Sequence, residues 1–118
     1  MHPNTIILNS HDLHEKSLGL RFDLPQLGQF ATGFVVRYQG RAHAYVNKCA
    51  HVPIELDWKQ GEFFTTAKDY IICATHGAHY VPDTGYCIMG PCKGKNLQAI
   101  PVTEQNQQIT IHIDKLHK

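Results

Sequence analysis

The sequence predicts a small all-β protein, and three observations support that prediction. Short runs rich in β-branched and aromatic residues recur along the chain, and residues typical of turns separate them. Only residues 12–20 could form a helical turn or two. The 118 residues suffice for about one domain. We therefore expect a single domain over residues 1–118, built as a β-sandwich or a small barrel.

The first half of the chain contains a clear hairpin pattern. Residues 34–38 and 41–46 are strand candidates, and the pair Gln39-Gly40 between them forms a short turn. Residues 6–8 and 20–24 are weaker strand candidates that precede this hairpin. These segments predict antiparallel pairing early in the chain.

The second half of the chain repeats the alternation of short strands and breaks. Its strand candidates are residues 69–73, 80–81, 86–89 and 108–113. A Pro-Asp-Thr-Gly turn at 82–85 separates two of them, because proline presets φ and glycine supplies a positive φ. In the last candidate, Ile109, Ile111 and Ile113 lie on one face. Pro101, within the mixed stretch 97–102, marks the edge of a sheet.

The composition excludes several classes of protein. Eleven Lys and Arg residues against ten Asp and Glu leave a net charge of +1, so we expect no nucleic acid as a partner. The longest apolar run, residues 70–74, is far shorter than the roughly 20 residues of a membrane span. Residues 1–13 lack the pattern of a secretory signal, so we expect a cytoplasmic protein with reduced cysteines.

Cysteines and histidines gather in two long irregular stretches, residues 47–62 (the first loop) and 74–79 (the second loop). The first stretch contains Cys49-Ala50-His51, and Cys73-Ala74-Thr75-His76 leads into the second. Two thiolates and two imidazoles are four metal ligands, and a Cys₂His₂ zinc site would use the same residue types. A nucleophilic cysteine paired with a histidine is a third interpretation. The spacing alone leaves these possibilities open.

The residues around the second cysteine narrow the choice. Cys73-x-x-His76-Gly77 is followed by the aromatic Tyr80, by an Asp-Thr-Gly turn ending at Gly85, and by Gly90-Pro91. This pattern resembles the Rieske iron–sulfur family, whose signature is C-x-H, a spacer, and then C-x-x-H-G. The resemblance extends over residues 34–102. It implies a Rieske-like antiparallel β-sandwich or small barrel, with a cluster-binding subdomain of two loops at about residues 47–92.

The resemblance also implies the cofactor and its ligands. Cys49 and Cys73 would bind one iron of a [2Fe–2S] cluster, with one cluster per chain, and His51 and His76 would bind the other iron. The histidine iron would lie outermost, so that the two imidazole rings form the electron exit. Rieske centres have reduction potentials of about −150 to +300 mV.

Neighbouring positions are expected to tune that potential. High-potential members of the family have a serine two residues after the last histidine ligand and a tyrosine four residues after it. Here these places hold Ala78, which cannot donate a hydrogen bond, and Tyr80, which can. Pro91 belongs to the segment that covers the cluster in the family. The disulfide of the respiratory members cannot form, because its places hold Ile54 and Thr75.

Two further cysteines lie outside the expected ligand set. Cys87 and Cys92 are spare thiols, and a buried, free state is the default for each in a reduced cytosol. Cys92 directly follows Gly90-Pro91, which would place it near the metal site.

A lone domain of this kind is similar to the ferredoxin components of multicomponent oxygenases and to small subunits of nitrite reductases. We therefore expect a monomeric electron carrier, not an enzyme, that passes single electrons from a flavin reductase to a terminal oxygenase or another oxidoreductase. Val52, Pro53 and Ile54 would supply an apolar docking rim. Two alternatives are a redox- or iron-sensing regulatory module and a zinc-binding interaction domain.

Overall fold

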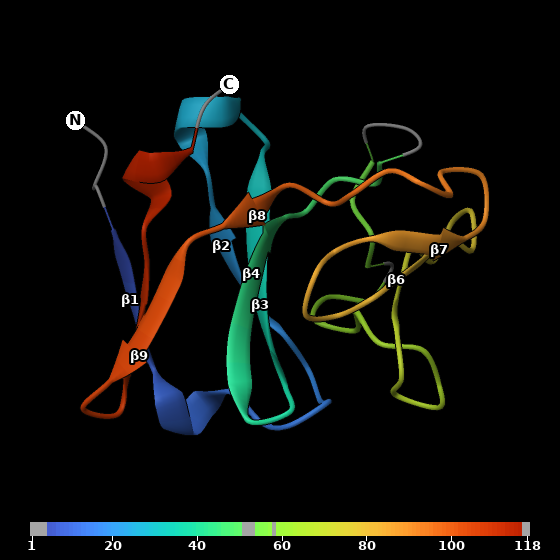
Figure 1. Cartoon of the computed structure of the whole chain (residues 1–118). Coiled ribbons are helices and arrows are strands. Elements are labelled where there is room, and N and C mark those ends of the chain that lie inside the picture. The colour runs from blue at the N-terminus through green and yellow to red at the C-terminus, as the bar shows by residue number, and fades with distance from the viewer. Residues whose placement is uncertain (1–4, 51–53, 58, 117–118) are drawn as a thin grey trace.

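The computed structural model describes residues 5–50, 54–57 and 59–116, and in these ranges the chain is built almost entirely from short strands (Figure 1). In chain order the strands are β1 (Ile6–Asn9), β2 (Leu20–Asp23), β3 (Thr32–Tyr38), β4 (Arg41–Val46), β5 (Ile71–Ile72), β6 (His79–Tyr80), β7 (Cys87–Met89), β8 (Ala99–Ile100), β9 (Val102–Gln105) and β10 (Gln108–Ile111). Three 3₁₀ turns accompany them: η1 (Ser10–Asp12), η2 (Pro25–Leu27) and η3 (Ile113–Lys115). The all-β prediction is confirmed.

The strands form three antiparallel sheets in two lobes. Sheets β1-β10-β9 and β2-β3-β4-β8 face each other and make up the sandwich lobe. Sheet β5-β6-β7 and the loops around it make up the small lobe, which lies to the right in Figure 1. No helix in the described ranges is long and apolar enough to cross a bilayer.

Strand β3 is buried on both faces, and this is how the two lobes are joined. Val35 points into the core between the two sheets of the sandwich, together with Ile109 and Ile111. Phe34 points the other way, into a core shared with the small lobe, where its ring stacks on Phe63 with centroids 3.9 Å apart. Because successive side chains of a strand alternate between faces, one strand can support both cores.

The β3–β4 hairpin forms as the sequence predicts. Tyr38 pairs with Arg41, which leaves Gln39 and Gly40 as the two turn residues. Their φ angles are +54° and +78°, and a two-residue turn with positive φ at both positions matches the twist of a hairpin.

The structure corrects the helical expectation for residues 12–20. The only helical residues nearby form η1, which ends at Asp12. Beyond it, Glu15 forms a β-bridge with Arg37, and the Lys16 amide donates to the Arg37 carbonyl at 2.8 Å. This pairing with the edge of β3 holds the segment extended, and a φ of +50° at Lys16 interrupts any helix.

Two expected strands are shorter than predicted. The candidate at residues 69–73 contributes only β5, which Phe64 extends by a single bridge to Ile71. The alternating segment 108–113 ends as strand β10 at Ile111, and Ile113 begins η3. Ile113 is nevertheless buried with the core of the sandwich, so the predicted apolar face is retained.

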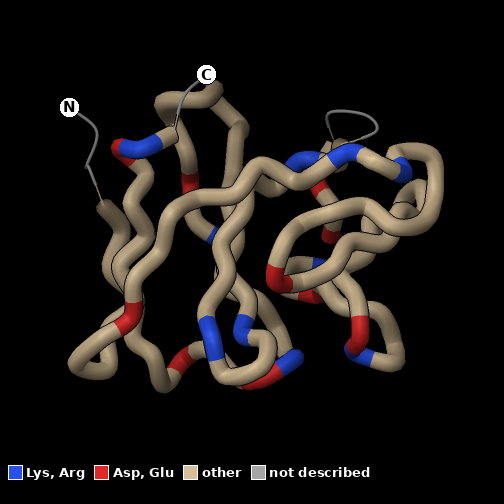
Figure 2. The backbone as a smooth tube through the Cα atoms, in the orientation of Figure 1, with Lys and Arg blue, Asp and Glu red and all other residues tan. Residues whose placement is uncertain are grey.

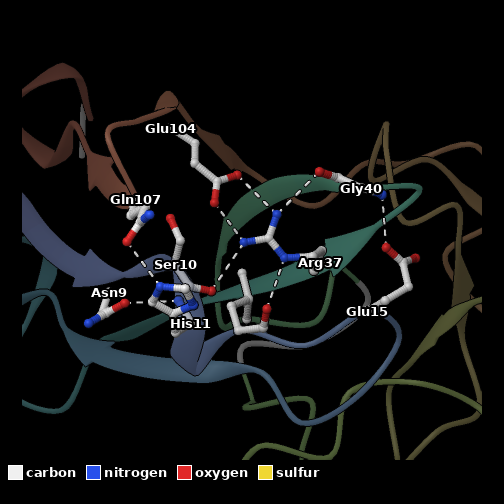
Figure 3. A network of polar contacts seen from close by, with 9 residues as sticks. Asn9, Ser10, His11, Glu15, Arg37, Gly40, Glu104 and Gln107 are labelled. Atoms are coloured by element: carbon white, nitrogen blue, oxygen red, sulfur yellow. Dashed lines mark hydrogen bonds and ion pairs between the residues drawn. The ribbon is translucent and has the colours of Figure 1, made fainter.

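Charged residues are scattered over both lobes (Figure 2). The best-connected of them is Arg37, whose guanidinium lies between β3, β9 and the segment after η1 (Figure 3). It donates to both carboxylate oxygens of Glu104, at 3.0 and 2.7 Å, and to the Leu13 carbonyl at 2.9 Å. The hydrogen bond to Arg37 lowers the pKa of Glu104. This bidentate pair ties the two sheets of the sandwich together.

Candidate metal centre

The two predicted cysteines each begin a loop that closes in the same way. The Cys49 amide donates to the Ile54 carbonyl at 2.8 Å, and the Cys73 amide donates to the Ala78 carbonyl at 2.9 Å. Each cysteine therefore closes a loop onto the residue five positions later. Gly77, with a φ of +72°, completes the second closure by donating to the Cys73 carbonyl at 2.8 Å.

The two loops are also tied to each other. The Ala74 amide donates to the Leu56 carbonyl at 2.9 Å, which joins the segment after Cys73 to the first loop. This bond keeps the two cysteine-bearing turns in register without a shared strand.

A buried carboxylate, that of Asp57, anchors the first loop. The Asp57 side chain is fully buried and accepts hydrogen bonds from Asn47 Nδ2 at 3.0 Å and from the Gly61 amide at 2.9 Å. Arg21 on β2 pairs with the same carboxylate at 3.4 Å. Asn47 in turn accepts from the Leu56 amide at 2.9 Å. This network, which no local sequence pattern predicts, fixes the base of the loop to the sandwich lobe.

The two cysteine thiols come together in the interior of the small lobe. Cys49 and Cys73 are buried, and their side chains are hydrogen-bonded to each other. Burial and the neighbouring thiol raise the pKa of Cys73, while backbone amides of His76 and Thr75 donate to its sulfur and oppose that rise. Amide donors of this kind stabilise a thiolate, which is the form that binds metal.

The predicted histidines lie farther out or outside the described residues. His76 is exposed on the second loop. Its side chain does not lie close enough to the two cysteines to share a metal ion with them. Among the residues that the structure describes, no three His, Cys, Asp or Glu side chains are close enough to hold one. His51, with Val52, Pro53 and Trp58, lies outside those residues.

Tyr80 connects this centre to its surroundings. The side chain is fully buried on β6, and its hydroxyl lies 3.4 Å from Cys49 Sγ and 3.2 Å from Cys92 Sγ. The hydroxyl also accepts the Ala50 amide at 3.0 Å. Burial, followed by the bonds with both cysteines, raises the pKa of Tyr80, so the hydroxyl keeps its proton and remains a donor.

The Gly90-Pro91 segment packs on the second loop. A Cβ at Gly90 would lie 2.8 Å from the Ala78 Cα, and the φ of Gly90 is +104°. Ala78 is fully buried at this contact, whereas Pro91 is exposed. Only glycine permits both the close approach and the backbone conformation at this position.

The two spare cysteines also lie beside the centre. Cys92 is buried against Tyr80, close to the expected metal site. Cys87 is buried too, and its sulfur lies 2.8 Å from Cys92 Sγ. The sequence analysis expected the position of Cys92 but not its contact with Cys87, which depends on how the intervening turn folds.

A family model matches residues 7–108, and it describes the Rieske [2Fe–2S] domain. The chain belongs to the Rieske [2Fe–2S] domain family. It therefore carries one [2Fe–2S] cluster, a centre that serves electron transfer. The donor set fits this group, because both predicted cysteine ligands are buried, the Cys73 sulfur receives amide hydrogen bonds, and His76 of the same motif is exposed. The zinc interpretation loses its support with this assignment.

Solved structures with similar folds include complete ferredoxins and parts of oxygenases. The ferredoxin of carbazole 1,9a-dioxygenase from Nocardioides aromaticivorans IC177 matches with a TM-score of 0.70 and 21% identity, over 92% of this chain and 97% of that one. A complex of reduced oxygenase and oxidized ferredoxin in carbazole 1,9a-dioxygenase contains a chain that matches with a TM-score of 0.75 and 20% identity, over 98% of both chains.

The terminal oxygenase of carbazole 1,9a-dioxygenase from Novosphingobium sp. KA1 matches with a TM-score of 0.74 and 20% identity. The match covers 97% of this chain but only 31% of the oxygenase chain, so the present Rieske chain spans about a third of that relative. At these identities the structural matches establish the fold. No curated protein sequence matches the chain.

Proposed function

We propose that this protein is an electron carrier, not an enzyme, and that it passes single electrons from a flavin reductase to a terminal oxygenase or a similar oxidoreductase. Cys49 and Cys73 hold the inner iron of its cluster, and His51 and His76 hold the outer iron. When bound, the cluster supplies a one-electron redox couple. The chain's own residues hold it, tune its potential and present it to partners.

The observation that carries this proposal is the difference in burial across the site: the cysteines are buried, whereas His76 is exposed. Cys73 is fully buried, and three residues later the chain reaches the surface at the exposed His76. A metal ligand at the surface lets a partner approach the redox centre closely. Buried thiolates on the other side shield the centre from solvent.

Apolar contact rather than long-range steering suits the docking of a partner. The net charge is only +1, so the long-range field of the whole molecule is weak. Thr75 and Pro91 are exposed beside the site, and Ile54 is half-buried at the rim. Val52 and Pro53, which the sequence predicts as rim residues together with Ile54, lie outside the described residues. With weak steering, association rates should depend little on ionic strength.

Electron transfer can be tested directly with the purified holoprotein. Reductive titration should take up about one electron per chain. Rapid mixing with a flavin reductase, its nicotinamide cofactor and a Rieske-dependent oxygenase should show reduction and then reoxidation of the centre during turnover. A centre that is reduced but never reoxidised by any oxidoreductase, and whose redox state instead controls binding to a partner, would favour the regulatory module.

The ligand assignment is tested by substitution at matched cysteines. Cys49→Ser and Cys73→Ser should each abolish the cluster, because each removes a ligand from the same iron. Cys87→Ser provides the control: it alters an equally buried cysteine that lies outside both ligand motifs, and it should retain the cluster. Loss of the cluster in the Cys87 variant, with retention in the Cys49 variant, would show that the wrong thiols have been assigned.

A further inference from the structure

Cys87 and Cys92 form a pair of buried thiols that the electron-carrier function does not use. Cys87 begins β7, and Cys92 lies in the turn that follows. The Cys87 amide donates to the Lys95 carbonyl at 2.8 Å, and the Gly94 amide donates to the Cys87 carbonyl at 3.0 Å. These two bonds fold the turn back over β7. Cys92 is thereby brought directly over Cys87.

The distance between the two sulfurs is the decisive observation. Cys92 Sγ and Cys87 Sγ are 2.8 Å apart. Ordinary contacts between non-bonded heavy atoms are roughly 3.5–4.0 Å, whereas the sulfurs of a disulfide are about 2.03–2.05 Å apart. The pair therefore needs to close by less than an ångström. The backbone bonds that set this arrangement involve neither sulfur, so they persist when the sulfurs join.

We propose that Cys87 and Cys92 are a reversible dithiol–disulfide centre beside the iron–sulfur cluster. Its oxidant is a low-molecular-weight disulfide. One cysteine thiolate attacks that disulfide and releases one small thiol, and the second thiolate then attacks the mixed disulfide and releases the other. Two S–H bonds and one S–S bond are lost, one S–S bond forms in the protein, and both protons and both electrons leave on the two small thiols.

Access to the pair is through the turn. Cys92 is only 1% exposed, but its neighbours Pro91, Lys93 and Gly94 are all exposed. A local opening of this single turn exposes the sulfur without disturbing the sandwich core. Thiol–disulfide exchange is accordingly slow. Once the disulfide has formed, the turn closes again and buries it.

The pair is linked to the cluster through one hydroxyl, and this link rests on the proposed role of Cys49 as a ligand. Tyr80 Oη lies 3.2 Å from Cys92 Sγ and 3.4 Å from Cys49 Sγ. In the dithiol state Cys87 donates to the Met89 carbonyl and Cys92 donates to Cys87 Sγ, so Cys92 Sγ can only accept from the tyrosine. The single tyrosine proton is therefore shared between Cys92 Sγ and Cys49 Sγ, and the bond that Cys92 donates makes its sulfur a stronger acceptor. The disulfide has no S–H, so its formation weakens this competition, leaves the tyrosine proton to Cys49 and favours the reduced cluster.

Disulfide formation is tested on the holoprotein equilibrated anaerobically in buffers of reduced and oxidised glutathione. After unfolding and alkylation, mass spectrometry should find two fewer alkylated thiols in the oxidising buffer, and a peptide linking Cys87 to Cys92. Cys87→Ser and Cys92→Ser are the matched controls and should show no such loss. Full alkylation of both cysteines at every ratio of glutathione would overturn the proposal, as would a bridge that includes Cys49 or Cys73.

The link to the cluster is tested by voltammetry on the two forms. The disulfide form should favour cluster reduction about twofold more than the dithiol form, a rise of roughly 20 mV for a one-electron couple. Tyr80→Phe should abolish this difference. Equal potentials in the two wild-type forms would overturn the link. Visible absorbance of the same samples reports cluster content, so a failure of the cluster assignment is distinguished from a failure of the disulfide.

Discussion

Removing the Tyr80 hydroxyl should lower the reduction potential of the cluster. Tyr80→Phe keeps the ring that fills the core of the small lobe and deletes only the oxygen. That oxygen lies 3.4 Å from Cys49 Sγ, within range of an O–H···S hydrogen bond. The sulfur becomes more negative when the cluster is reduced, so the bond stabilises the reduced state more than the oxidised state. Its loss therefore makes reduction harder.

The size of the change follows from the strength of one bond. A hydrogen bond to a charged group contributes about 1.5–3 kcal/mol, of which we take ~1–2 kcal/mol as the preference for the reduced state. For a one-electron couple ~59 mV corresponds to a tenfold change in equilibrium, or about 1.36 kcal/mol, so the potential should fall by roughly 40–90 mV. The variant also leaves the Ala50 amide without its partner. Thermal stability should therefore fall by about 1–2 kcal/mol.

Protein-film voltammetry on the wild type and on Tyr80→Phe measures this shift. The wild-type potential should itself lie in the lower half of the range of about −150 to +300 mV, because Ala78 supplies no second hydrogen bond. A loss of stability with an unchanged potential would refute the reasoning. It would show that the hydroxyl supports Ala50 but does not act on the cluster.

Three further substitutions test the framework around the site. Glu104→Gln should lower the free energy of unfolding by up to about 1 kcal/mol at neutral pH. Arg37 lowers the pKa of Glu104 from 4.5, so the difference in melting temperature between the variant and the wild type should disappear as the pH falls through the pKa of Glu104 in the folded protein. Gly90→Ala should destabilise the protein by about 1–3 kcal/mol in chemical denaturation, clearly more than Gly94→Ala, which has a similar positive φ but open space around it. Asp57→Asn should cost about 2–3 kcal/mol, because one of the buried donors to its carboxylate loses its acceptor, and it should speed cluster loss in a chelator assay.

The sequence predicts those elements whose structure depends on residues close together in the chain. The β3–β4 hairpin follows from two β-rich runs around Gln39-Gly40, and both residues adopt the positive φ that the turn requires. The two cysteine loops were predicted from the residue types and from the glycines and aromatic residue around them. In each case neighbours in the chain supply the signal.

Contacts between distant segments decide the features that the sequence analysis missed. Residues 12–20 are extended because Lys16 pairs with Arg37, a partner that no local pattern reveals. The Asp57 anchor combines β2 with the first loop in the same way. The contact between Cys87 and Cys92 depends on the fold of one turn, although their separation by a Gly-Pro break was a signal that the turn could bring them together.

The composition of the bound cofactor tests the central claim most directly. Anaerobically purified wild-type protein should contain about two irons and two acid-labile sulfides per chain, with visible absorbance. This stoichiometry follows if two cysteines bind one iron and two histidines bind the other. A colourless protein with one zinc per chain and no labile sulfide would contradict it.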